Sequence, residues 1–247
     1  MQYLTADTYN GTYAVEQARE GSGVPVFFSG GYNSRSSAIV WNPRPGKDWL
    51  KLIDTRYPDS PIYRVIWPSG AGDSNIGKTY QNPIHKILSK PWVNPLNDFN
   101  NAESRATRCG KLLAVYISNN LPGRWPVLIG HSLGTRIVAT AAADLTQSCG
   151  GGQLTAVHLL GAALHRSENW EDRLAYSTTN GVYNYYSNWE IGNIEAAYGV
   201  SIGFSSRPLG TLGVGSRRSD KQPLFTDVDV SKWVHNHKAY FDNVTLW

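Results

Sequence analysis

Short apolar segments rich in β-branched and aromatic residues alternate along this chain with segments whose apolar positions follow a helical period. The apolar segments end at Gly, Pro or Asn and have the length of a buried strand. Because these runs are almost continuously apolar, we expect both faces of their sheet to be covered, as in a parallel sheet. Strands are predicted within 24–34, 62–70, 127–129, 154–164 and 181–187.

Helical periodicity fills the intervals between these strands. It predicts a short helix within 49–58, one near 84–88, a long one over 100–122 and an Ala-rich one over 133–148. Alternating strands and helices indicate the α/β class, with a mostly parallel central sheet and helices on both faces. The 247 residues suffice for one such domain, 1–247, and are few for two.

Residues 191–222 are rich in Gly and Ser and match neither period. We interpret most of this stretch as a long connection over the surface. A lid over a substrate pocket is the alternative.

Charge and composition remove several classes of function. Charged residues make up 17% of the chain, the net charge is +4, and no block of Lys and Arg occurs. Nucleic-acid binding therefore does not follow, although weak contact with an anionic membrane surface is compatible with this charge. No apolar stretch approaches the roughly 18 residues of a membrane span. The oligomeric state stays open.

The N-terminus lacks the basic and apolar regions of a secretory signal. A cytoplasmic location is the default expectation, and export by a route without a cleavable signal is the alternative. Cys109 and Cys149 are the only cysteines, and neither belongs to a Cys/His cluster. We expect two buried thiols, or one disulfide, and neither a metal nor a cofactor.

The strongest chemical motif is Gly130-His131-Ser132-Leu133-Gly134. It has the pattern G-x-S-x-G between a predicted strand and a predicted helix, which is the context of a nucleophile elbow. In such a turn the glycines remove Cβ atoms that would collide with neighbouring backbone. Ser132 is the predicted nucleophile, and an ordinary Gly-rich turn without chemistry is the alternative.

Backbone N–H groups near Ser132 could stabilise a developing oxyanion. The helix that begins after Ser132 directs the N–H of Leu133 back toward the hydroxyl. A second donor is expected after an early strand, where Gly31 or Tyr32 follows the run "VPVFF". A plain glycine turn there is the competing interpretation.

A serine nucleophile needs a base, and in this fold the base follows the serine and the acid in chain order. That order excludes His85 and disfavours His131. His158 lies in a predicted buried strand, and His165 precedes the expected position of the acid. His235 and His237 lie in the expected region, and spacing alone does not separate them.

The acid is expected on the loop that leaves the strand within 181–187. Glu190 lies just past this strand, and no Asp occurs between Asp172 and Asp220. Glu195 is the alternative. A carboxylate there would orient the imidazole and stabilise its charged form.

With these residues in place, the chain resembles a family of α/β-hydrolase-like proteins described as a domain of unknown function. This family occurs in bacteria and fungi and in eukaryotic transmembrane and coiled-coil domain-containing proteins. The segments that carry the resemblance are "IYRVIWPSG", "VLIGHSLGTRIV", "HLLGAAL", "NYYSNWEIGN" and "VDVSKWVHNHKAY". The chain lacks the apolar membrane segments of the eukaryotic members, so it resembles their catalytic module alone.

The resemblance also implies site residues. In the family an acid, commonly Asp, stands three residues after a Tyr-Ser pair, which here leads from Ser187 to Glu190. Near the end, a Gly-His pair is followed by an aromatic residue three positions later. Here Asn236 replaces the glycine, Tyr240 is the aromatic residue, and the match selects His237 over His235.

The function expected from these features is a serine hydrolase of the carboxylesterase or lipase type, using a Ser132–His237–Glu190 triad. Aromatic residues at Phe27, Tyr32 and Trp67 favour an acyl pocket and thus short acyl or lipid esters. One rival is a catalytically inactive module of the same fold that binds or scaffolds. Another is acyl transfer from thioesters or amides.

Overall fold

The structure, a computed structural model, describes most of the chain. The described residues are 2–5, 13–31, 49–69, 95–149, 154–189, 208–214 and 225–247. The predicted helix near 84–88 lies outside them.

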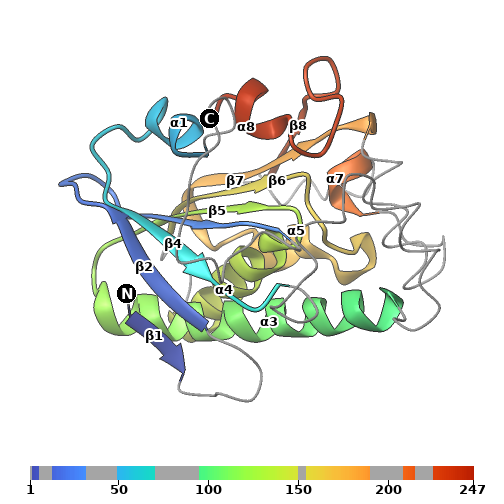
Figure 1. Ribbon diagram of the computed structural model, residues 1–247. Helices are drawn as coiled ribbons and strands as arrows, with labels where there is room; N and C mark the ends of the chain where they lie inside the picture. The colour runs from blue at the N-terminus through green and yellow to red at the C-terminus, as the bar shows by residue number, and fades with distance from the viewer. Residues whose placement is uncertain are drawn as a thin grey trace, which may run out of the picture.

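One eight-stranded sheet runs through the molecule, with the strand order β1-β2-β4-β3-β5-β6-β7-β8 (Figure 1). Strand β2 pairs antiparallel with β1 and β4, and all other neighbours are parallel. The strands are β1 (Gln2–Thr5), β2 (Tyr13–Arg19), β3 (Val26–Ser29), β4 (Ile62–Ile66), β5 (Val127–His131), β6 (Leu154–Leu160), β7 (Thr178–Tyr186) and β8 (Phe225–Asp229). The predicted mostly parallel α/β sheet is confirmed, and β5 lies at its centre.

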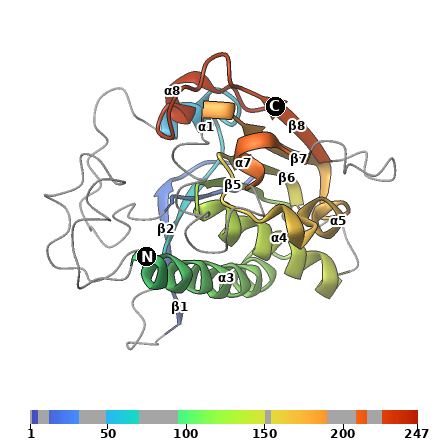
Figure 2. The ribbon, with the colours of Figure 1, turned by 90° about the vertical axis from the view of Figure 1, so that its right-hand side faces the viewer.

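Helices cover both faces of this sheet. One face carries α1 (Trp49–Asp54) and α8 (Tyr240–Asn243), and the other carries α3 (Pro95–Asn120), α4 (Gly134–Cys149) and α5 (Trp170–Leu174) (Figure 1). The short helix α7 (Leu209–Leu212) lies at the edge where β6 and β7 end (Figure 2). None of the helices in the described part of the chain is both long and apolar enough to cross a membrane.

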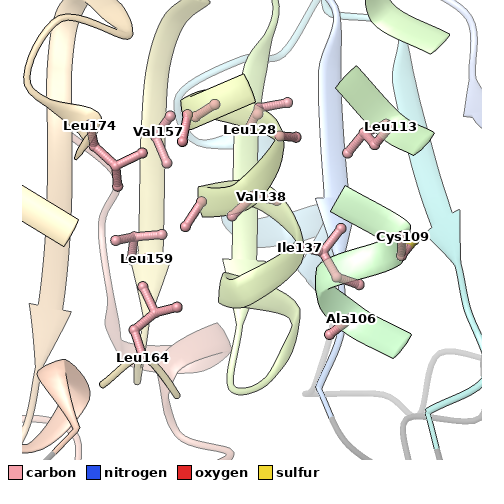
Figure 3. Close-up of a cluster of buried hydrophobic side chains, with 14 of the residues drawn as sticks. Ala106, Cys109, Leu113, Leu128, Ile137, Val138, Val157, Leu159, Leu164 and Leu174 are labelled. Atoms are coloured by element: carbon pink, nitrogen blue, oxygen red, sulfur yellow. The ribbon is translucent and has the colours of Figure 1, made fainter. Parts of the chain in front are cut away.

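The larger core lies between the sheet and the pair α3 and α4. Figure 3 shows side chains of α4 lying between those of α3 on one side and those of β5 and β6 on the other. Cys109 of α3 is a buried free thiol in this core, and burial raises the pKa of this thiol. A second core fills the opposite face, where Phe28 stacks on Trp49 at a centroid distance of 4.4 Å. Burial on both faces explains the continuous apolar runs of the central strands.

Helices α3 and α4 approach each other at Gly110. A Cβ atom at this position would lie 2.6 Å from the Ile137 carbonyl oxygen and 2.6 Å from the Thr140 Cβ. The missing side chain at Gly110 therefore sets the spacing of the two helices.

Three features depart from the sequence predictions. Strands β1, β2 and β8 were not predicted, and α3 begins at Pro95 rather than at residue 100. Within 191–222, residues 208–214 do not run over the surface, because Leu209 and Thr211 are fully buried. Backbone hydrogen bonds from Leu209 N–H to the Leu164 carbonyl and from Gly210 N–H to the Ala162 carbonyl hold α7 against the end of β6. The rest of that stretch lies outside the described residues.

Candidate active site

The chain turns sharply between β5 and α4 at Ser132. Ser132 has φ 56°, and Asn169 is the only other non-glycine residue in the described ranges with a positive φ. Left-handed backbone is unfavourable for an L-residue and persists where surrounding structure enforces it, often at functional sites. The G-x-S-x-G motif thus forms a tight turn between a strand and a helix, with the serine in left-handed backbone.

The two motif glycines are required by close backbone contacts. A Cβ at Gly130 would lie 2.6 Å from the Thr135 Cα, and one at Gly134 would lie 2.6 Å from the Gly30 carbonyl oxygen. Any larger residue would push α4 away from β5 or from the end of β3. These are the collisions that the sequence pattern predicts.

Hydrogen bonds fix the turn to the neighbouring strand. Ser132 N–H donates to the Leu160 carbonyl at 3.0 Å, and the Ser132 carbonyl accepts from the Thr135 hydroxyl at 2.5 Å. The same hydroxyl accepts from Ala163 N–H at 3.1 Å. Thr135 therefore links the elbow to the loop after β6, a role that the sequence analysis did not assign.

The expected oxyanion loop lies directly against Ser132, the predicted nucleophile. A Cβ at Gly31 would be 2.8 Å from the Ser132 Oγ, so only a glycine backbone fits there. The Trp67 indole N–H donates to the Gly30 carbonyl at 3.2 Å and holds this loop from the side of β4. Leu133 is buried at the entry to α4. Tyr32, the other candidate donor, lies outside the described residues.

The aromatic residues expected to line an acyl pocket take a different role. Phe27 is fully buried and stacks on Tyr63 at 4.8 Å, and Trp67 is 1% exposed. Both side chains belong to the larger hydrophobic core, which lies between the sheet and helices α3 and α4. The expectation that Phe27 and Trp67 line an acyl pocket is therefore wrong.

His237 lies beside the elbow, although it is more than a hundred residues away in sequence. Its ring centroid is 4.6 Å from that of His131, and its carbonyl oxygen is 2.7 Å from the His131 Nε2. Burial, reinforced by the neighbouring His237, lowers the pKa of His131 to about 3. The His131 ring is therefore neutral near pH 7, and its Nε2–H donates to the His237 carbonyl.

The other histidines occupy distinct surroundings. His235 is exposed and its ring lies 5.2 Å from that of Trp189. His158 is buried between the hydroxyls of Tyr57 and Tyr185, at 3.0 and 3.1 Å. His165 Nε2 is 3.1 Å from a Glu103 carboxylate oxygen. His85 lies outside the described residues.

The predicted acid Glu190 and its alternative Glu195 also lie outside the described residues. The residues just before Glu190 are described, and they contact the segment that leads to His237. The Ser187 hydroxyl donates to the Val234 carbonyl at 2.6 Å and accepts from Trp189 N–H at 3.2 Å. In the sequence analysis Ser187 served only to locate Glu190 three residues later. A side-chain bond to a backbone carbonyl leaves no pattern in the sequence.

Within the part of the chain that the structure describes, no group of three or more His, Cys, Asp or Glu side chains is arranged to hold a metal ion.

The strand order, the antiparallel β2 and the elbow after the central strand define a protein of the α/β-hydrolase fold. The chain belongs to the family described as "Protein of unknown function (DUF726)", which matches residues 85–245. A comparison with curated proteins gives no match.

Several solved structures are similar to the chain at low identity. A serine hydrolase without a lid from Xanthomonas campestris is 15% identical, with 89% of this chain and 78% of that chain covered and a TM-score of 0.38. Mouse alpha/beta hydrolase domain-containing protein 10 is 14% identical (66% and 50% covered, TM-score 0.35). A type II thioesterase of yersiniabactin biosynthesis is 13% identical (61% and 49% covered, TM-score 0.35). The chain thus spans about half the length of the last two, and none of these similarities indicates an activity.

Proposed function

We propose that this protein is a serine hydrolase that cleaves carboxylic esters through an acyl-enzyme. The observation that carries the proposal is the left-handed backbone of Ser132, at φ 56°, between the central strand β5 and helix α4. Such strain is unfavourable, and here it places a hydroxyl at the start of α4 and against the glycine loop at Gly31.

In the proposed reaction the Ser132 Oγ attacks the ester carbonyl while the His237 imidazole takes the hydroxyl proton. Backbone N–H groups of Leu133 and of Gly31 or Tyr32 stabilise the oxyanion. The imidazolium then protonates the leaving alcohol, and an acyl-enzyme remains. Water, deprotonated by His237, attacks the acyl-enzyme and releases the carboxylic acid and Ser132. Glu190 orients the imidazole.

The surroundings of His237 support this assignment over His235. His237 packs on the residue that precedes the nucleophile, whereas His235 is exposed and contacts Trp189. Two neighbouring histidines in one turn therefore have different access to the elbow.

The first expected result concerns the nucleophile. An alkyl fluorophosphonate probe is expected to label the wild-type protein, and Ser132→Ala is expected to abolish labelling, because the probe reacts only with an activated serine. Labelling is measured by gel fluorescence and by mass spectrometry of the modified peptide. Absence of wild-type labelling would favour the inactive, binding or scaffolding alternative.

Substrate class is tested on the same pair of proteins. A panel of p-nitrophenyl esters of graded acyl length, with matched thioesters and amides, is measured for kcat/KM. We propose short acyl or lipid esters as the preferred class. If the matched thioester or amide is turned over faster than the ester, the proposal of ester hydrolysis is wrong and the protein acts on thioesters or amides.

The second expected result separates the two histidines. His237→Ala is expected to lower kcat by about 10³-fold or more, and Glu190→Ala by less, because the acid acts through the imidazole. His235→Ala, the matched control two residues away, is expected to retain most activity. A dead His235→Ala variant beside an active His237→Ala variant would reverse the assignment of the base.

A further inference from the structure

The segment between β8 and α8 that carries His237 has no regular secondary structure. Residues 230–239 form turns and coil. A base that must receive a proton from Ser132 needs a placement error well below 1 Å, because misplacement on that scale costs about 10²-fold in rate. A backbone hydrogen bond from Val230 N–H to the Tyr186 carbonyl fixes one end of this segment, and side chains from other elements fix the rest.

One such side chain is Ser187, at the end of β7. It is fully buried, and its hydroxyl donates to the Val234 carbonyl at 2.6 Å while accepting from Trp189 N–H at 3.2 Å. The bond to Val234 joins two segments 47 residues apart in sequence. One of them leads to Glu190, and the other leads to His237.

The second side chain is His131, which reaches the same segment from the elbow. Its Nε2–H donates to the His237 carbonyl at 2.7 Å. The rings of Tyr240 and Phe241, with centroids at 5.9 and 4.7 Å, enclose the imidazole and hold its orientation. The His237 backbone is thereby bonded directly to the residue that precedes Ser132.

From these contacts we propose that Ser187 and His131 are positioning residues for the reaction of Ser132. Ser187 joins the segment of the base to the segment of the acid, and His131 joins it to the nucleophile. This inference rests on the proposed function. It holds that these two hydrogen bonds, the tethers, set the distances between Ser132, His237 and Glu190.

A neighbouring bond between the same two segments provides a matched control. Asn188 N–H donates to the Ser231 hydroxyl at 3.0 Å, but this bond lies at the exposed surface. Water can replace a hydroxyl there, whereas nothing replaces the Ser187 hydroxyl in the interior. Ser231→Ala therefore removes the same chemical group from the same pair of segments without disturbing a buried tether.

The experiment compares wild type, Ser187→Ala, Ser187→Thr and Ser231→Ala, with His131→Phe as the test of the second tether. Three quantities are measured: kcat and KM on the preferred p-nitrophenyl ester, the rate of fluorophosphonate labelling, and amide hydrogen exchange of residues 230–239. Ser187→Ala and His131→Phe are expected to lower kcat about 10-fold to 100-fold with KM changed little. Their exchange in 230–239 is expected to rise while the strands stay protected.

Ser187→Thr restores the hydroxyl and is expected to recover most of the lost kcat and protection, and Ser231→Ala is expected to resemble wild type. If Ser187→Ala keeps wild-type kcat and exchange, the inference is wrong. If kcat falls in all variants together with a general loss of protection, the residues only stabilise the fold, and the inference is again wrong. If wild type itself is neither labelled nor active, the proposed function fails, and exchange in 230–239 still reports whether the tethers hold this segment.

Discussion

At the scale of single residues, the proposed site depends on positions where a side chain is absent or strained. Ser132 adopts a left-handed backbone that an L-residue avoids, and Gly31 leaves the space that its hydroxyl occupies. The strain at Ser132 is maintained by hydrogen bonds to Leu160 and Thr135. The conformation of Ser132 on which the proposed reaction depends is therefore present before substrate binds, which is the condition for electrostatic preorganisation.

Adding one methyl group at Gly31 tests this dependence. Gly31→Ala places a Cβ 2.8 Å from the Ser132 Oγ, so the hydroxyl or the loop must move. We expect the rate of fluorophosphonate labelling to fall by about 10²-fold. Because the new Cβ would also collide with the Ser132 Cβ, thermal stability is expected to fall as well, so labelling is measured at a temperature where circular dichroism shows the variant folded.

Gly123→Asn is the control for this substitution. Gly123 has φ 71° and no atom within 4 Å of an added Cβ, and Asn tolerates this backbone region. Labelling of Gly31→Ala at the wild-type rate would show that the loop does not confine the hydroxyl.

At the scale of elements, α3 and α4 pack against each other at Gly110, where glycine is required although alanine is normally the better helix residue. Replacing Gly by Ala within a helix normally stabilises it by up to about 1 kcal/mol. At Gly110 the new Cβ would meet the backbone of α4 at Ile137 and the side chain of Thr140. Separation of the two helices would open the core that Figure 3 shows.

We therefore expect Gly110→Ala to lower the free energy of unfolding by about 1–3 kcal/mol, the usual cost of overpacking. Urea denaturation followed by circular dichroism measures it. Ser118→Ala, at an exposed position of the same helix, is expected to raise the free energy of unfolding by a few tenths of a kcal/mol. A gain in stability for both variants would contradict the proposed role of Gly110.

At the scale of the whole molecule, stability is expected to depend on pH through two buried imidazoles. Burial is the main cause that lowers the pKa of both His131 and His158 from 6.5 to about 3. Between about pH 3 and 6.5 the unfolded chain therefore binds more protons than the folded one. The free energy of unfolding therefore rises with pH across this window, and it falls when the solution is acidified from pH 6.5 toward pH 3.

His158→Gln tests this dependence away from the site. Each such histidine contributes a slope of up to about 1.4 kcal/mol per pH unit, and the variant is expected to lose one contribution. Urea denaturation between pH 4 and pH 7 measures the slope, with His235→Gln at the exposed position as the control. An unchanged slope in His158→Gln would show that His158 does not titrate on unfolding.

The features that were predictable from the sequence are those with a local signal. The central strands are continuously apolar, and the G-x-S-x-G motif carries its own steric requirement. Strand β2 gives no such signal, because only Tyr13, Ala14 and Val15 are buried and polar residues follow. Helix α7 has only four residues, one of them Gly210 packed on Ala162, and so short a segment shows no helical period in sequence.

The site was predictable in the same uneven way. The choice of His237 over His235 came from family spacing and stays a prediction, as does Glu190. The bonds from His131 and Ser187 end on backbone carbonyls, which every residue possesses. Such contacts depend on tertiary structure alone, so they cannot be predicted from a pattern of residues.

Strand β5 forms its parallel ladder with β3 on one side, from Val26 opposite Val127 to Ser29 opposite Gly130. The family match begins at residue 85 and so excludes β3 and Gly31. A recombinant fragment cut at that boundary would expose an apolar strand edge, which favours self-association, and would lack the loop that faces Ser132. Proteins meant for biochemical work on this chain should therefore start well upstream of the matched region.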